Sequence, residues 1–265
     1  MGARKEPDVT NLKPASGRLK DKTVIVTGST SGIGKACAIL FAWEGARVTV
    51  VGRRKDAGAA VVDRITQDGG KAIFVNADIT READRQSIVS HTLETFGSID
   101  GLLNNAGCLI SKPTLELTRE DWERFTDLDG YSYLRMMQLV IPHMERQGGG
   151  AICNCTSLAA IDNDVPGGAL YCFVKAGVNH MTHCIAKEFI DRGIRVNNLC
   201  PGLVETEMVL TGPGAADFDA IVDRLPARRA ATALEIAYGA LHLLSDESSY
   251  TSGTSLVIDA SQRGY

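Results

Sequence analysis

The sequence lacks several features that define other classes of protein. No apolar run in its 265 residues is long enough to cross a bilayer, and residues 1–20 lack the apolar core of a signal peptide. Basic residues are not in excess, since 28 Lys and Arg stand against 32 Asp and Glu, so we expect neither nucleic acid nor a membrane as a partner. We therefore predict a water-soluble, cytoplasmic protein.

The cysteines and histidines form no complete metal-binding pattern. The seven cysteines are odd in number and scattered through apolar segments, so we expect buried, reduced thiols. Cys153 and Cys155 are one pair in a predicted strand, but no second pair completes a zinc site. His180 and His183 are three residues apart on a predicted helix, without further ligands near them in the sequence. The sequence therefore predicts no metal.

What the chain does contain is an alternation of short apolar strands and amphipathic helices. Strands are predicted over residues 23–26, 47–52, 72–75, 99–103, 151–155, 194–199 and 255–258. Pro142 interrupts the long helical region that follows Thr118, so we expect a kink or an end there. This alternation predicts an α/β fold, namely a single-domain, Rossmann-like doubly wound parallel sheet of about seven strands.

The domain organisation is simple. Residues 1–18 mix charge, proline and glycine with little apolar periodicity, and we expect a flexible N-terminal leader there. Residues 19–265 form the predicted Rossmann-type catalytic domain, without an internal repeat. Residues 203–230 contain proline and glycine and no strong period, so we interpret them as a lid segment of this domain.

A glycine turn follows the first strand. Gly28 permits a tight turn, Gly32 lets the backbone approach a pyrophosphate, and Gly34 lets the next helix pack close to the strand. The helix that begins there offers free N–H groups and a partial positive charge to phosphate. A strand, a glycine turn and a helix in this order indicate the phosphate-binding half of a βαβ unit.

The other unusual residue clusters also fall at predicted strand ends, where ligands of such sheets bind. They are residues 52–54, 78–79, 104–107, 156–157 and 200–206. The alternative is that these are ordinary polar turns. Because the glycine turn lies at the same edge of the sheet, we favour a nucleotide site.

A possible acid–base pair lies further along the chain. Tyr171 and Lys175 stand one helical turn apart, so their side chains share a face. An ammonium group beside a phenol favours the phenolate, so we predict that Lys175 lowers the tyrosine pKa from about 10 toward neutrality. Ser157, 14 residues before the tyrosine, can donate a hydrogen bond to a substrate oxygen.

Together these motifs resemble the one-domain branch of the short-chain dehydrogenase/reductase family, over about residues 19–260. The matching positions are the Thr-Gly-x-x-x-Gly-x-Gly turn of residues 27–34, Asn104-Asn105-Ala106-Gly107, Ser157, Tyr171, Lys175, and Pro201-Gly202 with Thr206. The resemblance implies hydride transfer between a nicotinamide and a carbonyl or carbinol carbon. It implies that Tyr171 is the acid/base, that Ser157 anchors the substrate oxygen, and that Lys175 binds the cofactor ribose and tunes the tyrosine.

The resemblance also implies a set of cofactor-binding residues. Asp78 and Ile79 resemble the adenine contacts, and Thr206 a carboxamide or phosphate contact. The full set is Gly28, Ser29, Thr30, Ser31, Gly32, Ile33, Gly34, Arg53, Arg54, Asp78, Ile79, Asn105, Ala106, Gly107, Tyr171, Lys175, Pro201, Gly202, Val204 and Thr206.

One position departs from the family pattern. Seven residues after Trp122, where the family usually has an asparagine of its proton relay, this chain has Asp129. We place Asp129 with the catalytic residues, and its extra negative charge near Lys175 would oppose the lowering of the tyrosine pKa. The alternative is that the alignment is off by one helical turn.

The choice of cofactor depends on the end of the second strand. NAD enzymes generally place a carboxylate there for the adenosine ribose. This chain has Gly52-Arg53-Arg54, with no acid to repel a 2′-phosphate and two guanidinium groups that can pair with it. We predict NADP, with NAD as the alternative.

The leading interpretation is therefore an NADP(H)-dependent oxidoreductase that interconverts a secondary alcohol and a ketone. The loops near the site supply the apolar Ile161, Val165, Val204, Met208 and Val209 and the acidic Asp162, Asp164, Glu205 and Glu207, which argues against a strongly anionic substrate. The alternatives are an NAD-linked catabolic dehydrogenase and a dinucleotide-binding regulator with weak catalysis. The apolar run of the Tyr171 helix and the family resemblance predict a homo-oligomer, with a tetramer favoured.

Overall fold

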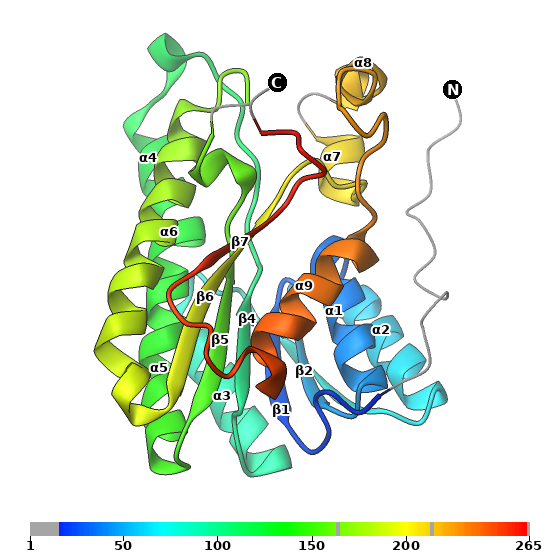
Figure 1. Ribbon diagram of the computed structural model, residues 1–265, viewed down its shortest axis with the longest axis vertical. Coiled ribbons are helices and arrows are strands. Elements are labelled where there is room, and N and C mark those ends of the chain that lie inside the picture. Colours follow the sequence, from blue (N-terminus) through cyan, green and yellow to red (C-terminus); the bar gives the residue numbers. More distant parts are fainter. Residues whose placement is uncertain (1–15, 163–164, 213–214, 264–265) are drawn as a thin grey trace.

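A seven-stranded parallel sheet forms the centre of the computed structural model, which describes residues 16–162, 165–212 and 215–263 (Figure 1). Its order is β3-β2-β1-β4-β5-β6-β7. The strands are β1 (Thr23–Thr27), β2 (Arg47–Gly52), β3 (Lys71–Asn76), β4 (Gly101–Asn104), β5 (Gly150–Cys155), β6 (Ile194–Pro201) and β7 (Ser255–Ile258). The predicted fold class is confirmed, although several strand ends differ by one or two residues.

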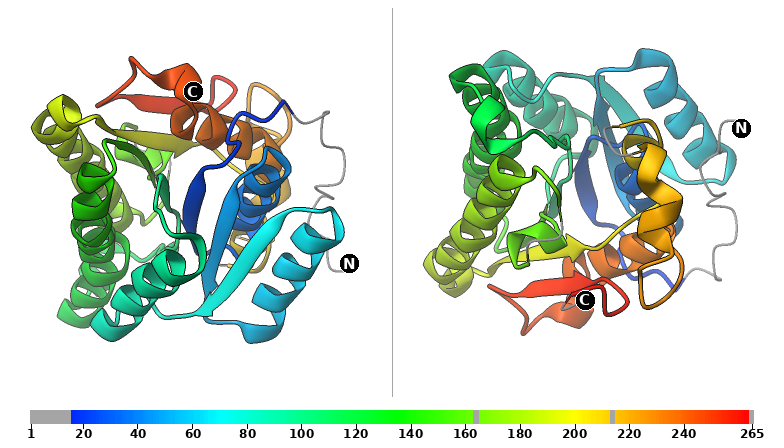
Figure 2. Two further views of the ribbon diagram at one scale, coloured as in Figure 1. Left: turned by 90° about the horizontal axis from the view of Figure 1, so that it is seen from below. Right: turned by 90° about the horizontal axis from the view of Figure 1, so that it is seen from above.

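Helices cover both faces of the sheet (Figure 2). One face carries α1 (Gly32–Trp43), α2 (Lys55–Gln67) and α9 (Ala233–Leu244). The other carries α3 (Glu82–Phe96), α4 (Arg119–Thr126), α5 (Ser132–Arg146) and α6 (Ala169–Phe189). Two short helices, α7 (Glu207–Thr211) and α8 (Phe218–Val222), lie in the lid segment.

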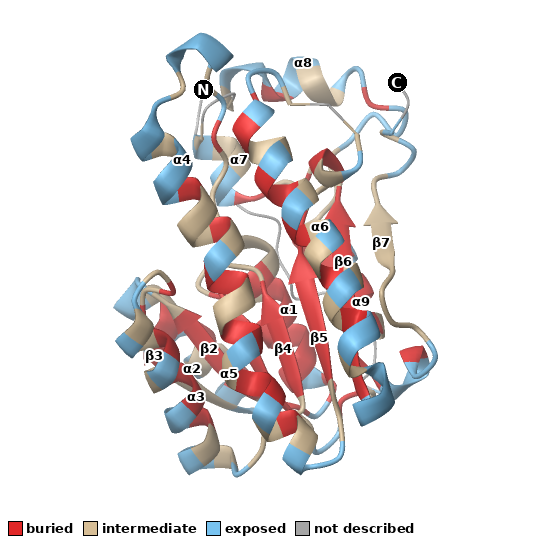
Figure 3. Ribbon diagram, turned by 90° about the vertical axis from the view of Figure 1, so that its left-hand side faces the viewer, coloured by how far each residue is buried: buried red, intermediate tan, exposed pale blue. Residues whose placement is uncertain are grey.

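The central strands are apolar on both faces because both faces are covered. Every residue of β1, β4 and β6 is buried, whereas the edge strands β3 and β7 are only partly so (Figure 3). Two apolar cores result, one on each side of the sheet. Cys153 and Cys155 both lie in the core beneath α1 and α9. All seven cysteines are free, as expected, but only four are buried, and Cys184 is exposed.

The strand order reverses between β1 and β4, which are neighbours although they are not consecutive. In a parallel sheet the loops on either side of such a point leave the edge in opposite directions and open a crevice. The loops that follow β1 and β4 carry the glycine turn and residues 104–107. The topology therefore brings together the two clusters that the sequence indicated.

The helix does not end at Pro142, which was one of the two outcomes that we expected there. Helix α5 continues through it to Arg146, because Met137, Ile141 and Met144 pack into the core and outweigh the lost backbone hydrogen bond. The irregularity comes earlier, at Asp127–Tyr131, where one wide π-helical turn joins α4 to α5. Such turns often occur at functional sites, and Asp129 lies in this one.

The lid segment contains more structure than its sequence indicated. Besides α7 and α8, its two ends are joined by a parallel bridge between Val204 and Ala231. Of the predicted leader, residues 1–15 lie outside the described residues, as do Asp164 and residues 213–214 of the lid. Arg18, at the leader's end, donates hydrogen bonds from Nε and Nη2 to Glu247, and Leu19 is buried.

Candidate active site

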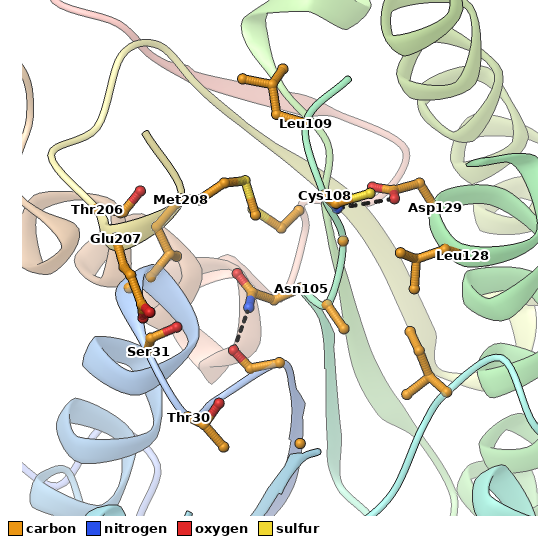
Figure 4. A pocket seen from close by; sticks show the side chains of 18 of the residues that line it. Thr30, Ser31, Asn105, Cys108, Leu109, Leu128, Asp129, Thr206, Glu207 and Met208 are labelled. Atoms are coloured by element: carbon orange, nitrogen blue, oxygen red, sulfur yellow. Dashed lines mark hydrogen bonds between the residues drawn. The ribbon is translucent and has the colours of Figure 1, made fainter. Parts of the chain in front are cut away.

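A cavity of about 970 Å³ lies at the carboxyl ends of the strands, above the point where the strand order reverses. It extends from the ends of β2 and β3, past the glycine turn, to β5 and α6. Thr206, Glu207 and Met208 line it from the segment that follows β6 (Figure 4). All but two of the predicted site residues line it. The exceptions are Ser29 and Gly34.

Hydrogen bonds join the glycine turn to the end of β4. Asn105 donates from Nδ2 to the carbonyls of Thr27 and Gly28, at 3.0 and 3.2 Å, and the Thr27 hydroxyl accepts from the backbone N–H groups of Asn105 and Ala106. Gly28 has φ +65°, and a Cβ there would lie 2.6 Å from Cα of Ala106. Only glycine therefore allows this approach.

Ser29 and Gly34 shape the turn from behind the cavity. The buried hydroxyl of Ser29 donates to the carbonyl of Val26 and accepts from the N–H of Val51, so it ties β1 to β2. Gly34 lies against the carbonyl of Gly28 and the side chain of Asn105, where a Cβ would not fit. Both residues act through the position of the turn.

Ser157, Tyr171 and Lys175 meet on the opposite wall of the cavity. Ser157 follows the end of β5, and its hydroxyl accepts from the N–H of Ala159 at 3.1 Å and hydrogen-bonds the phenol of Tyr171. Tyr171 and Lys175 project from the first turns of α6, with Nζ of Lys175 at 5.8 Å from the centre of the tyrosine ring. The three predicted catalytic groups are therefore adjacent.

Asp129 faces Lys175 directly. Its Oδ1 lies 2.7 Å from Nζ of the lysine, and the two side chains are 0% and 5% exposed. Its Oδ2 accepts from the backbone N–H of Cys108 at 3.2 Å (Figure 4). Gly107 lies so close to the carboxylate that no Cβ would fit there. The π-helical turn thus delivers a carboxylate to the same wall that carries the tyrosine.

The ammonium group of Lys175 can donate three hydrogen bonds. One is directed at Asp129, and a second at the carbonyl of Cys155, 3.4 Å away. The lysine also lies 5.3 Å from the centre of the buried Tyr133 ring, whose hydroxyl donates to the same carbonyl. Lys175 lines the cavity, so its third proton can serve a ligand hydroxyl there.

The prediction for the Tyr171 pKa was wrong for the protein alone. Burial raises this pKa above its usual value, and the opposing effects of Lys175 and of the Ser157 hydrogen bond do not outweigh it. Asp129 raises it further, as we expected from its charge. For Lys175, burial favours the neutral amine, but the attractions to Asp129, Tyr133 and Tyr171 together outweigh it, and the pKa of Lys175 is raised.

Comparison with known proteins gives the same result as the motifs. A family model described as enoyl-(acyl carrier protein) reductase matches residues 28–261. The chain is 35% identical over 241 residues to 7alpha-hydroxysteroid dehydrogenase of Escherichia coli K12, covering 91% of this chain and 94% of that protein. It is 36% identical to 3-oxoacyl-[acyl-carrier-protein] reductase of Thermotoga maritima, covering 91% and 98%. The chain belongs to the short-chain dehydrogenase/reductase family.

Solved structures of similar fold support the same family assignment. A 7 alpha-hydroxysteroid dehydrogenase complexed with NADH and 7-oxo glycochenodeoxycholic acid matches with a TM-score of 0.88 and 34% identity, covering 94% of this chain and 97% of that one. Levodione reductase matches with a TM-score of 0.89 and 29% identity, covering 93% and 100%. Among the described residues, no group of potential metal ligands and no helix able to span a membrane is present.

The two arginines at the end of β2 have different surroundings in this member of the short-chain dehydrogenase/reductase family. The side chain of Arg53 is 77% exposed, and its Nη1 lies 3.8 Å from Oδ2 of Asp78. Arg54 donates from Nη1 to both carboxylate oxygens of Glu207, at 2.8 and 2.9 Å. Of the pair, Arg53 is therefore the more available to a ligand.

Sequence reasoning missed several cavity residues. Four of them follow the loop at 104–107 or lie in the π-helical turn, and the others lie on α4 or in the lid segment. They include Cys108, Leu109, Asp127, Leu128, Arg124 and Thr211. None belongs to a motif, so only the three-dimensional path of their loops could have identified them.

Proposed function

We propose that this protein is a nicotinamide-dinucleotide-dependent oxidoreductase that interconverts a secondary alcohol and a ketone. The observation that carries the proposal is the meeting of Ser157, Tyr171 and Lys175 on one cavity wall, opposite a glycine turn suited to phosphate. Relatives such as 7alpha-hydroxysteroid dehydrogenase and cyclopentanol dehydrogenase support this reaction class.

The cavity suits a dinucleotide. Gly28 and Gly32 adopt left-handed backbone conformations, which open the turn before α1 to a phosphate group. Lys175 retains one proton for a ribose hydroxyl at the other end. When bound, the nicotinamide supplies the hydride acceptor or donor.

The protein's own residues handle the proton and the substrate oxygen. In reduction the phenol of Tyr171 donates its proton to the carbonyl oxygen, and in oxidation the phenolate removes the proton of the hydroxyl. The Ser157 hydroxyl donates a hydrogen bond to the same oxygen as charge develops on it. Lys175 stabilises the phenolate, and Asp129 limits how far it does so.

For the cofactor we propose NADP. Arg53 is exposed at the end of β2, where a carboxylate would otherwise select the ribose diol, and its guanidinium group can pair with a 2′-phosphate. The alternative is an NAD-linked dehydrogenase, which the similarity to a 7 alpha-hydroxysteroid dehydrogenase solved with NADH favours. Asp78 lies beside Arg53, but it follows β3 and not β2, where NAD enzymes place the carboxylate for the ribose diol.

The substrate we propose is uncharged or weakly charged and partly apolar. Leu109, Leu203, Met208 and Val209 line the cavity beyond the catalytic wall. Of the acidic residues expected near the substrate, Glu207 lies in the cavity, but it is bound to Arg54.

We test the function by measuring turnover of both dinucleotides with a panel of secondary alcohols and ketones. Tyr171→Phe should lose turnover by about 10³-fold or more while NADPH affinity stays within about twofold, because the phenol moves the proton and contributes little to binding. Equal, negligible rates in both proteins would instead favour the dinucleotide-binding regulator. Near-normal turnover of Tyr171→Phe would overturn the mechanism.

A further inference from the structure

The carboxylate of Glu207 lies beside the glycine turn at the start of α1, which we expect to bind the phosphates of a dinucleotide. Glu207 is the first residue of α7, and its side chain points at the glycine turn, toward Ser31 (Figure 4). Its oxygens accept from Nη1 of Arg54 at 2.8 and 2.9 Å and it hydrogen-bonds Ser31. One side chain of the lid thus bridges the end of β2 and the residue before α1.

Thr206, the residue before Glu207, also lies close to the glycine turn. Thr206 is 8% exposed, and its methyl carbon would lie 3.3 Å from a Cβ placed on Gly32. Helix α1 has no acidic residue in its first turn, and the Ser31 side chain makes no capping hydrogen bond to it. The positive end of α1 therefore lacks an anion of its own, and the carboxylate of Glu207 lies beside it.

Glu207 is ionised at neutral pH. Its hydrogen bond to Arg54 lowers the carboxyl pKa, and although burial opposes this, the charge of Arg54 and the bond to Ser31 add to the lowering. A carboxylate and a phosphate cannot share Ser31 and Arg54 without repulsion, since both are anions. The two groups must compete.

We propose that Glu207 is a cofactor-affinity-determining residue that occupies the phosphate site of the cofactor-free protein and is displaced when a dinucleotide binds. The inference rests on the proposed dinucleotide function of this cavity. Displacement breaks the contacts of Glu207 with Arg54 and Ser31 and frees both for phosphate. It also releases α7 from the glycine turn, so the lid changes its contacts in the same step.

The experiment compares Glu207→Gln with the wild type and with Glu205→Gln. Glu205 precedes Thr206 in the same segment, but it does not line the cavity, so it is a matched control for the loss of one lid charge. We expect Glu207→Gln to bind both NADPH and NADH about three- to tenfold more tightly, which equals about 0.7–1.4 kcal/mol, and Glu205→Gln to match the wild type. Fluorescence titration of each reduced cofactor measures this.

A second measurement needs no cofactor. Trypsin can cleave the lid at Arg224, an exposed arginine between α8 and the end of the segment. We expect the cofactor-free Glu207→Gln protein to be cleaved there faster than the wild type, by about the same factor as the gain in affinity, because its lid has lost an anchor. Glu205→Gln should be cleaved at the wild-type rate.

The outcomes separate this inference from the proposed function. Wild-type protein that binds neither dinucleotide overturns the proposed function, and the cleavage rates then decide whether Glu207 holds the lid. Binding that is unchanged or weaker in Glu207→Gln overturns the competition, while the proposed function stands. Unchanged cleavage overturns the anchoring of the lid.

Discussion

Nζ of Lys175 lies 2.7 Å from Oδ1 of Asp129, and neither side chain is more than 5% exposed. A buried lysine without a countercharge would tend to lose its proton, so the carboxylate keeps the ammonium group charged. The same carboxylate opposes the effect of that charge on Tyr171. Asp129 therefore keeps the lysine charged and offsets part of the lowering that this charge exerts on the Tyr171 pKa, while burial is the main reason that the tyrosine stays protonated.

This arrangement predicts a shifted pH profile in Asp129→Asn. Removing the negative charge should lower the apparent pKa of Tyr171, so the oxidative rate should begin to rise at lower pH. The measurement is kcat for alcohol oxidation against pH, read as a property of the coupled groups. Asp127→Asn, two residues earlier in the same π-helical turn, is the control and should leave the midpoint unchanged. An unshifted profile in Asp129→Asn would make Asp129 a bystander.

Lys175→Ala should damage both binding and turnover, in contrast to Tyr171→Phe. The variant loses the group that can bind the ribose, and it leaves the buried carboxylate of Asp129 without its counterion, which costs about 3 kcal/mol or more of folding stability. We expect cofactor affinity and kcat each to fall by at least tenfold, with a lower melting temperature. Lys175→Ala in an Asp129→Asn background should recover part of the stability. A normal cofactor affinity in Lys175→Ala would exclude a binding role.

The stability contribution of Lys175 has a definite pH range. Because the folded pKa of this lysine is raised, its contribution is complete below the unfolded value of about 10.4 and is lost only as the pH rises through the folded value. The difference in free energy of unfolding between the wild type and Lys175→Ala should therefore stay constant between about pH 6 and 9, provided that no other group titrates differently in the two proteins. Denaturant unfolding at several pH values measures it.

The parts of the fold and site that local sequence determines could be predicted. Gly28 and Gly32 are required by backbone conformation, and the spacing of Tyr171 and Lys175 follows from the helix period, so these placements are confirmed by the structure. The π-helical turn at Asp127–Tyr131 could not be predicted, because no residue type specifies it.

Properties that depend on distant residues could not be predicted either. The tyrosine pKa depends on burial, which the Tyr171–Lys175 spacing does not report. Arg54 and Glu207 are 153 residues apart in the chain, and only the path of the lid brings them together. The apolar run of α6, from which we predicted a homo-oligomer, packs partly against the core, where Met181, Ile185 and Phe189 are half-buried.

Ser157→Ala should slow the chemical step. The Ser157 hydroxyl is placed to donate a hydrogen bond to the substrate oxygen, and loss of such a donor costs about 3–4 kcal/mol of transition-state stabilisation. We expect kcat to fall by about 10²–10³-fold with cofactor affinity unchanged. Ser157→Thr, which keeps the hydroxyl, should retain more activity than the alanine variant. Steady-state kinetics of the two variants checks this, and equal activities would show that the hydroxyl does not act on the substrate.

We still predict a homo-oligomer, now from a different surface. Trp122 of α4 and Phe173 of α6 are 46% and 54% exposed, and their ring centres lie 4.7 Å apart. Two exposed aromatic rings in contact form an apolar patch that association would cover. Sedimentation velocity at micromolar concentration should give an oligomer, weakened in Trp122→Ser/Phe173→Ser. Tyr250→Ser, at an exposed aromatic residue elsewhere, is the control. A monomeric wild type would refute the prediction.

Arg53 gives the sharpest test of cofactor choice. Its guanidinium group is exposed, with a 3.8 Å contact to Asp78, so it can turn to a 2′-phosphate with little loss. We expect the wild type to bind NADPH more tightly than NADH, and Arg53→Ala to reduce that preference by about 1.5 kcal/mol, or about tenfold. NADH affinity should stay the same, because NADH carries no 2′-phosphate. Lys55→Ala, at a nearby exposed cation that does not line the cavity, controls for a general loss of positive charge. Tighter binding of NADH by the wild type, or an unchanged ratio in Arg53→Ala, would assign the enzyme to NAD.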